Sequence, residues 1–317
     1  MNDYLMIILA FITSFILCFI FCKFHLKKIN STPKDQIEVI ALNPLHKFKS
    51  CGGIDFLLAT SISFIIFNFN NFNKVIIILL FTMFYYGLIG FIDDFIKIKK
   101  QNNKGLSIFL RIILEIIGVI ILCNLLSIHL IEFVKIKNNY LYIGSFALIY
   151  MIICVLGCCN GLNLTDGLDG LATITYILTI IPFFYISILQ GNKTITIFLV
   201  CLIASLLSYL LFNFNPSKLI MGDVGSLSLG AILAVVAISL NAEYLILISG
   251  LVYVIEALSV IIQVLFFKIS KGKRIFKMAP LHYHFIKSGM KDSNVVLMFT
   301  VFSIICSFIA TIIGVIL

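Results

Sequence analysis

The chain has 317 residues, of which 61% are hydrophobic and only 12% are charged, and its mean hydropathy is +1.15. Soluble domains carry about 25% charged residues, so this composition excludes an ordinary soluble protein. The net charge of +9 does not indicate nucleic-acid binding, which requires a basic groove with stacking aromatic side chains on a soluble surface. We therefore predict an integral membrane protein.

The apolar residues fall in runs separated by short polar breaks. A helix that crosses a membrane needs about 17–25 residues, and most runs reach that length. Open strands are excluded within lipid because their unpaired backbone groups find no water there. The sequence thus predicts an all-α, polytopic fold with a single transmembrane domain over residues 1–317. Ten helices are expected, over residues 4–22, 54–68, 75–92, 108–126, 140–159, 171–189, 195–212, 224–240, 244–267 and 295–316.

Lys and Arg residues are unevenly distributed over the loops between these helices. With alternate loops on opposite sides of the membrane, one side holds 19 of the 23 basic residues. Positive charge is retained in the cytoplasm, so this side is predicted to be cytoplasmic and both termini are predicted to lie outside. The cytoplasmic segments are then expected near residues 23–53, 93–107, 160–170, 213–223 and 268–294.

Acidic residues gather at the cytoplasmic ends of the predicted helices. An ionised carboxylate within the bilayer costs about 2.5–3.5 kcal/mol, so acids near a membrane interior are usually functional. Five of the 14 acids lie at such ends, all on the same side: Asp93, Asp94, Asp166, Asp169 and Asp223. They are predicted to converge on one layer at the cytoplasmic surface.

Each acidic cluster has a functional and a plain structural interpretation. The adjacent carboxylates of Asp93 and Asp94 repel, which suits a metal site or a base; the alternative is a solvated pair that ends a helix. Asp166 and Asp169 are three residues apart and would share one face of a helical turn, or they belong to a simple polar connection. Asp223 could cap the next helix, whose free N–H groups also favour phosphate.

The longest cytoplasmic segment carries histidines beside several cations. His282 and His284 follow four basic residues within 271–277, and this suits an anionic ligand better than a metal. Carboxylates for Mg²⁺, cations for phosphates and a site at the membrane together favour phosphoryl transfer to a lipid. Catalysis would then be positioning and charge neutralisation, with the metal bridging phosphate oxygens.

Four stretches resemble the signatures of a known family, in the family's order. They read GFIDDFIK, NLTDGLDGLA, MGDVGSLSLG and KRIFKMAPLHYHF. They resemble the phospho-N-acetylmuramoyl-pentapeptide transferase family, within the polyprenyl-phosphate N-acetylhexosamine-1-phosphate transferases. NLTDGLDGLA is shared across that superfamily, whereas the last stretch is more specific to the muramoyl-pentapeptide branch. The similarity spans roughly residues 85–295.

The resemblance implies ten transmembrane helices in the bacterial plasma membrane, with the active site on the cytoplasmic face. It implies Mg²⁺-dependent transfer of phospho-MurNAc-pentapeptide from UDP to undecaprenyl phosphate, giving lipid I and UMP, and it allows a homodimer. The catalytic residues that it implies are Asp93, Asp94, Asp223 and His282, with Asp223 as the metal ligand. The substrate-binding residues that it implies are Lys97, Asn163, Asp166, Asp169, Asn213 and His284.

Several positions depart from the family pattern. Tyr283 stands where the family usually has a central His, and Ile220 where an aromatic residue usually stacks on uracil. Arg111 and Glu115 occupy positions where Lys and Gln are expected. Residues 48–53 keep only the two glycines of the family's Lys-x-Gly-Thr-Pro-Thr-Met-Gly-Gly stretch.

Two alternatives stay open at the level of sequence. Within the superfamily, the chain could transfer GlcNAc-1-phosphate from UDP-GlcNAc to a polyprenyl phosphate. From another class, it could be an ion-coupled transporter that uses Glu115 or Glu256, the acids well inside predicted helices. Transporter acids typically lie near the bilayer midplane, whereas the five clustered acids lie at helix ends.

Overall fold

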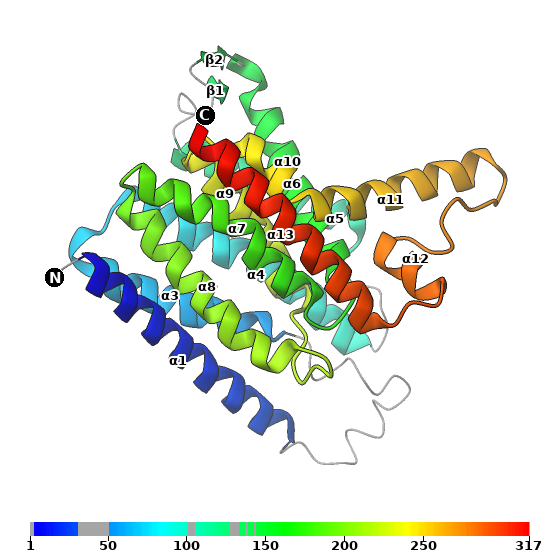
Figure 1. Cartoon of the computed structure of the whole chain (residues 1–317), viewed down its shortest axis with the longest axis horizontal. Coiled ribbons are helices and arrows are strands. Elements are labelled where there is room, and N and C mark those ends of the chain that lie inside the picture. Colours follow the sequence, from blue (N-terminus) through cyan, green and yellow to red (C-terminus); the bar gives the residue numbers. More distant parts are fainter. Residues whose placement is uncertain are drawn as a thin grey trace.

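The computed structural model describes residues 3–30, 51–100, 105–126, 133–136, 139–142 and 144–316. Most of the predicted cytoplasmic segment 23–53, including residues 48–50, lies outside the described residues. The α-helices (Figure 1) are α1 (Asp3–Asn30), α3 (Gly53–Asn68), α4 (Lys74–Lys100), α5 (Ile108–Leu126), α6 (Ala147–Thr165), α7 (Leu171–Leu189), α8 (Lys193–Asn213), α9 (Gly222–Ser239), α10 (Ile246–Ser249), α11 (Leu251–Ile269), α12 (Leu281–Lys287) and α13 (Asp292–Ile316). Short 3₁₀ helices are η1 (Phe69–Asn71), η3 (Gly144–Phe146) and η4 (Glu243–Leu245).

Ten helices of the described chain are long and apolar enough to cross a membrane, which confirms the predicted polytopic α-helical fold. They are α1, α3, α4, α5, α6, α7, α8, α9, α11 and α13. An even number of crossings brings both ends of the chain to the same side. The outside location of these ends stays a prediction from the distribution of Lys and Arg.

Four predicted boundaries are wrong by about seven or eight residues. Helices α1 and α4 continue to Asn30 and Lys100, where ends at 22 and 92 were expected, and two other helices begin later than expected. The fifth helix was expected over 140–159, but α6 covers Ala147–Thr165 and follows a hairpin of β1 (Phe133–Ile136) and β2 (Asn139–Tyr142), which pair antiparallel. The ninth was expected over 244–267, but η4 and α10 come first and α11 begins at Leu251. In both places the residues are apolar, and hydropathy alone does not distinguish a short strand or a broken helix from the start of a long one.

Helix α9 forms the centre of the bundle, with every residue from Val224 to Ile238 buried. Its small residues allow close helix packing, which drives association where lipid surrounds the protein. The Ser228 hydroxyl donates to the Met83 carbonyl of α4 over 2.6 Å. A side chain on Gly230 would reach the Cys159 backbone of α6 at 2.5 Å. Tight contacts on two sides therefore fix the register of α9 against α4 and α6.

Helices α11 and α12 depart from the compact bundle. Figure 1 shows α11 extending away from the other helices, after which the chain returns to α12 before entering α13. The outer part of α11 is highly exposed, with 52% of Ile261, 54% of Leu265 and 80% of Ile269 accessible. Apolar side chains of this kind are stable on a membrane protein because lipid covers them. The return segment brings the histidine-containing stretch back toward the bundle.

Gly90 provides a test of the contact between α4 and α9. A β-carbon at Gly90 would collide with the backbone of Asp223 and Val224, so Gly90→Ala is expected to destabilise the protein by about 1–3 kcal/mol and to reduce turnover by displacing Asp223. Gly157→Ala is the matched control, because no described atom beyond its chain neighbours and its own helix backbone lies within 4 Å of that β-carbon, and Ala is favoured over Gly within helices. The melting temperature in detergent should fall below that of wild type for Gly90→Ala only. Equal melting temperatures of the two variants would contradict the tight contact.

Candidate active site

Three carboxylates meet where α4 ends and α9 begins. Asp93 and Asp94 lie near the end of α4, Asp223 is the second residue of α9, and one oxygen of each lies within 4.8 Å of the others. Asp93 and Asp94 are only 3% and 5% exposed. The Asp93 carboxylate accepts the Leu106 backbone N–H over 2.6 Å, and Asp94 accepts that of Val224 over 3.3 Å. The predicted convergence of these three acids is therefore present in the structure.

Lys97 provides the first positive charge to this cluster. Its Nζ lies 2.6 Å from Asp93 and 2.9 Å from Asp223, and 3.6 Å from Asp94. Lys97 is one turn beyond Asp93 on α4, so the helix itself directs the ammonium group back onto the two aspartates. Three carboxyl groups thus surround one ammonium group, so acidic groups outnumber this cation.

Arg111 and Glu115 of α5 form a second charged pair at the cluster. Arg111 Nε lies 3.0 Å from the fully buried Glu115 carboxylate, and Arg111 Nη1 lies 3.5 Å from Asp223. These are the two positions where Lys and Gln were expected. The departures are coupled, because Glu115 gives the guanidinium a fixed partner four residues away. Arg111 was not among the predicted site residues. The sequence pattern that could have indicated it is a basic and an acidic residue four positions apart inside an otherwise apolar helix.

Asn163 links α6 to the acidic cluster. Its amide nitrogen donates to Asp223 and to the Ser226 hydroxyl, both over 2.8 Å. The sequence placed Asn163 in a loop over 160–170, but α6 continues through Thr165, so Asn163 is held on the last helical turns. Helical placement fixes the amide relative to Asp223 more firmly than a loop would.

Asp166 and Asp169 lie in the turn that joins α6 to α7, and the predicted shared helical face is absent because α6 ends at Thr165. The Asp169 carboxylate accepts the Ser217 backbone N–H over 2.9 Å, which ties this turn to the segment before α9. Asn213 supports the same segment: its amide donates to the Leu219 carbonyl and accepts from Thr173. The substrate-binding roles of these residues stay predictions.

Asp166 gives the fold a defined pH dependence. Its burial raises the pKa of this carboxyl from 3.8 to about 7; the charges of Asp223 and Asp94 add to the rise, and a hydrogen bond from the Gly222 backbone opposes it. Between about pH 4 and pH 7 the folded protein then binds one more proton at Asp166 than the unfolded chain. The free energy of unfolding therefore decreases as pH rises through this window.

Asp166→Asn is expected to reduce that pH dependence. Melting temperatures of the purified protein at pH 5 and pH 7.5 measure it, because wild type should lose stability toward pH 7.5 from this group and the variant should lose less. Asp3→Asn, at the exposed start of α1, is the control and should retain the wild-type difference. Identical pH profiles for wild type and Asp166→Asn would contradict the raised pKa.

The histidine segment approaches the site through α12. His282 is fully buried, and its Nδ1 lies 3.2 Å from a carboxylate oxygen of Glu256 in α11. The Tyr283 hydroxyl donates to the Gly167 carbonyl over 3.2 Å, so the residue in the place of the expected central His contacts the turn after α6. His284 instead accepts the Lys277 backbone N–H over 3.1 Å. The structure thus brings His282 and Tyr283 to the α6–α7 turn, while His284 stabilises the basic segment.

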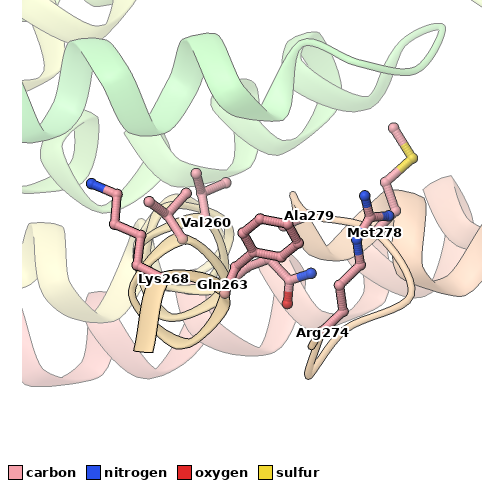
Figure 2. Close-up of a pocket in the computed structure, with 8 residues that line it drawn as sticks. Val260, Gln263, Lys268, Arg274, Met278 and Ala279 are labelled. Carbon is pink, nitrogen blue, oxygen red and sulfur yellow. The ribbon is translucent and has the colours of Figure 1, made fainter. Parts of the chain in front are cut away.

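A cavity of about 430 Å³ lies between α11 and the segment that returns to α12 (Figure 2). Val260, Val264 and Phe267 contribute apolar walls, and Lys268 and Arg274 contribute cations. It is lined by residues other than the acidic cluster, and its chemistry suits an amphiphile with a negatively charged end. The structure therefore holds a buried acidic cluster with Lys97 and Arg111 beside it and, at separate residues, an apolar cavity with basic side chains.

Fold and site together define a multi-pass membrane protein with a buried acidic cluster where α4 ends and α9 begins. Residues 76–241, just over half of the chain, match the model of glycosyl transferase family 4. Similar proteins named phospho-N-acetylmuramoyl-pentapeptide-transferase occur in Rickettsia felis (37% identical, over 95% of this chain and 90% of the relative), in Rickettsia canadensis (40%, over 75% and 72%) and in Wolbachia sp. subsp. Drosophila simulans (37%, over 94% and 96%). The chain belongs to the phospho-N-acetylmuramoyl-pentapeptide-transferase family.

Family membership decides between the two classes of function. The chain is a glycosyl-1-phosphate transferase and a multi-pass bacterial membrane protein. The transporter alternative is therefore wrong. The acids that supported that alternative have other partners: Glu115 pairs with Arg111 and Glu256 with His282. Homodimer formation stays a prediction from the resemblance.

Proposed function

We propose that the protein transfers phospho-MurNAc-pentapeptide from its UDP derivative to undecaprenyl phosphate, in a Mg²⁺-dependent reaction on the cytoplasmic face of the membrane. The products are lipid I and UMP, so the reaction is the first membrane step of peptidoglycan synthesis. The observation that carries the proposal is the cluster of Asp93, Asp94 and Asp223 around Lys97. The names of relatives that align over most of the chain support the choice of substrate.

The donor set of the cluster fits Mg²⁺. Three carboxylates offer oxygen atoms within 4.8 Å of one another, and Mg²⁺ prefers oxygen ligands and usually takes one or two carboxylates together with substrate phosphates and water. Asp223 is the proposed ligand, because it lies beside Lys97, Arg111 and Asn163 at the middle of the charged cluster. When bound, the metal would neutralise charge on the pyrophosphate oxygens.

The residues of the chain supply the remaining steps. Asp93 or Asp94 takes the proton from the phosphate of the lipid, whose oxygen then forms a bond to the β-phosphorus of the nucleotide sugar. The bond from that phosphorus to the bridging oxygen breaks, and UMP leaves with the bridging oxygen. Lys97 and Arg111 offset the charge on the phosphate oxygens during transfer, where fixed cations act most strongly.

The cavity beside α11 fits the lipid substrate in this scheme. Its apolar walls suit part of the isoprenoid chain, whose terminal phosphate lies at the acidic cluster in this scheme. The exposed apolar surface of α11 would let such a chain enter from the bilayer, without passage through water.

Mass spectrometry of the lipid product tests the proposal. Purified protein in detergent is incubated with UDP-MurNAc-pentapeptide, undecaprenyl phosphate and Mg²⁺, and the lipid fraction is analysed. A product with the mass of undecaprenyl-pyrophosphoryl-MurNAc-pentapeptide is expected, formed in equal amount with UMP. A second incubation contains both UDP-MurNAc-pentapeptide and UDP-GlcNAc. If its lipid product carries only GlcNAc-1-phosphate, the protein is instead a UDP-GlcNAc transferase of the same superfamily.

A further inference from the structure

Glu256 and His282 form a buried pair that joins the membrane-spanning α11 to the short helix α12. Both side chains have no exposed surface. One carboxylate oxygen of Glu256 accepts the backbone N–H of His282 over 3.2 Å, and the other lies 3.2 Å from His282 Nδ1. The two oxygens of one buried carboxylate thus contact the backbone and the ring of the same histidine. These two contacts fix the start of α12 and the plane of the ring.

The free side of the imidazole ring is directed at the turn that carries Asp166. His282 Nε2 is buried and has no hydrogen-bond partner among the described residues. It lies so close to Gly167 that a β-carbon there would collide with it. An unpartnered polar atom in a buried position is costly, so it calls for a ligand group at this place. Because Gly167 has no side chain, the backbone of the turn lies directly against the Nε2 edge of the ring.

The chemistry of this pair is that of an oriented histidine. A carboxylate is an acceptor only, so Glu256 requires a proton on Nδ1. In a histidine ring, the hydrogen bond made by one nitrogen determines how the other nitrogen can act on a ligand. With Nδ1 held by Glu256, Nε2 is the nitrogen left to bind a ligand group where the turn meets α12.

We propose that Glu256 is a positioning residue for the transfer reaction, and that it holds His282 so that Nε2 hydrogen-bonds a phosphate oxygen of the nucleotide sugar. The inference rests on the proposed function, because it takes a nucleotide sugar as the ligand. It gives a role to an acid deep in a transmembrane helix that neither the metal cluster nor the lipid cavity uses. Glu256 acts through His282 and has no contact with substrate of its own.

The test is a double-mutant cycle on steady-state kinetics, started only after wild type shows UMP release with UDP-MurNAc-pentapeptide. Glu256→Gln is expected to lower kcat/KM by about 10- to 100-fold, by analogy with removing a group that orients a metal-bound imidazole. Most of the loss should appear in KM for the nucleotide sugar, because the phosphate contact also exists in the ground state. Glu256→Asp keeps a carboxylate and should recover part of the activity.

His282→Asn removes Nε2 but keeps an amide that can donate to Glu256. If Glu256 acts only through His282, adding Glu256→Gln to His282→Asn should cause less than a twofold further loss, since residues of one unit are not additive. Losses that multiply in the double variant would overturn the proposal. They would show that Glu256 supports the fold independently of the histidine.

Glu243→Gln is the matched control, because Glu243 is also a buried glutamate, 6% exposed, in η4 at the far end of α9. Its kinetics should equal those of wild type. If wild type is active and Glu256→Gln has the same kcat/KM as Glu243→Gln, the positioning role is wrong. If wild type itself is inactive, the proposed function is refuted instead. Melting temperatures of all variants separate a loss of fold from a loss of positioning.

Discussion

Asp223→Asn is expected to lower turnover by at least about 10²–10³-fold, the range for removing one fixed electrostatic group from an active site. Asp223 is the residue on which Lys97, Arg111 and Asn163 converge, so its charge is the one that the others balance. Asparagine has nearly the same shape and keeps one oxygen that can accept from Asn163, which favours retention of the fold. UMP release and thermal unfolding in the same detergent measure the two effects.

Asp3→Asn makes the same chemical change at an exposed residue that pairs with Lys193. It should leave turnover at the wild-type level. Substantial activity in Asp223→Asn would contradict the proposed metal ligand. So would a loss of activity that is fully explained by unfolding, since the residue would then be structural.

Lys97→Met is expected to separate metal binding from catalysis. Removal of the ammonium leaves Asp93, Asp94 and Asp223 without the cation that lies within 3.6 Å of all three. Uncompensated buried charge destabilises a protein by about 3–5 kcal/mol, reduced here because Lys97 is partly exposed. Added Mg²⁺ should restore more stability in this variant than in wild type, because the competing cation is gone and binding to the folded state raises its stability.

Turnover of Lys97→Met should nevertheless fall by about 10²-fold, since the cation that offsets charge on the phosphates is missing. Lys99→Met is the control: it lies two residues further along α4 and is exposed. Melting temperatures with Mg²⁺ and with EDTA, measured beside UMP release, give both effects. A smaller Mg²⁺ response in Lys97→Met than in wild type would contradict a shared site for the lysine and the metal.

The sequence predicted the membrane class, ten spans and the acids at one end of the bundle, because these follow from hydropathy and from the cost of charge in lipid. Asp93, Asp94 and Asp223 could be grouped for that reason although 130 residues separate the first and last. The family motifs added Lys97 and Asn163. The structure then placed all five in one hydrogen-bonded and ion-paired cluster.

Contacts between distant helices could not be predicted in the same way. The pairing of Glu256 with His282 depends on how α12 folds back under α11, and hydropathy does not encode that geometry. The close contact of Gly90 with Asp223 depends on the relative register of two apolar helices, each of which looks uniform in sequence. Arg111 and Glu115 were noted only as departures from a pattern, and their pairing became evident from their distances.

The central claim is that the acidic cluster transfers a phospho-sugar from a uridine nucleotide to a lipid phosphate. Its most direct measurement is UMP release by purified wild-type protein with undecaprenyl phosphate, supplied in parallel with UDP-MurNAc-pentapeptide or UDP-GlcNAc, each with Mg²⁺ or EDTA. We expect UMP only with the muramoyl substrate and Mg²⁺. Release that persists in EDTA would contradict the metal role of Asp223, and no release with either nucleotide sugar from folded protein would contradict the claim itself.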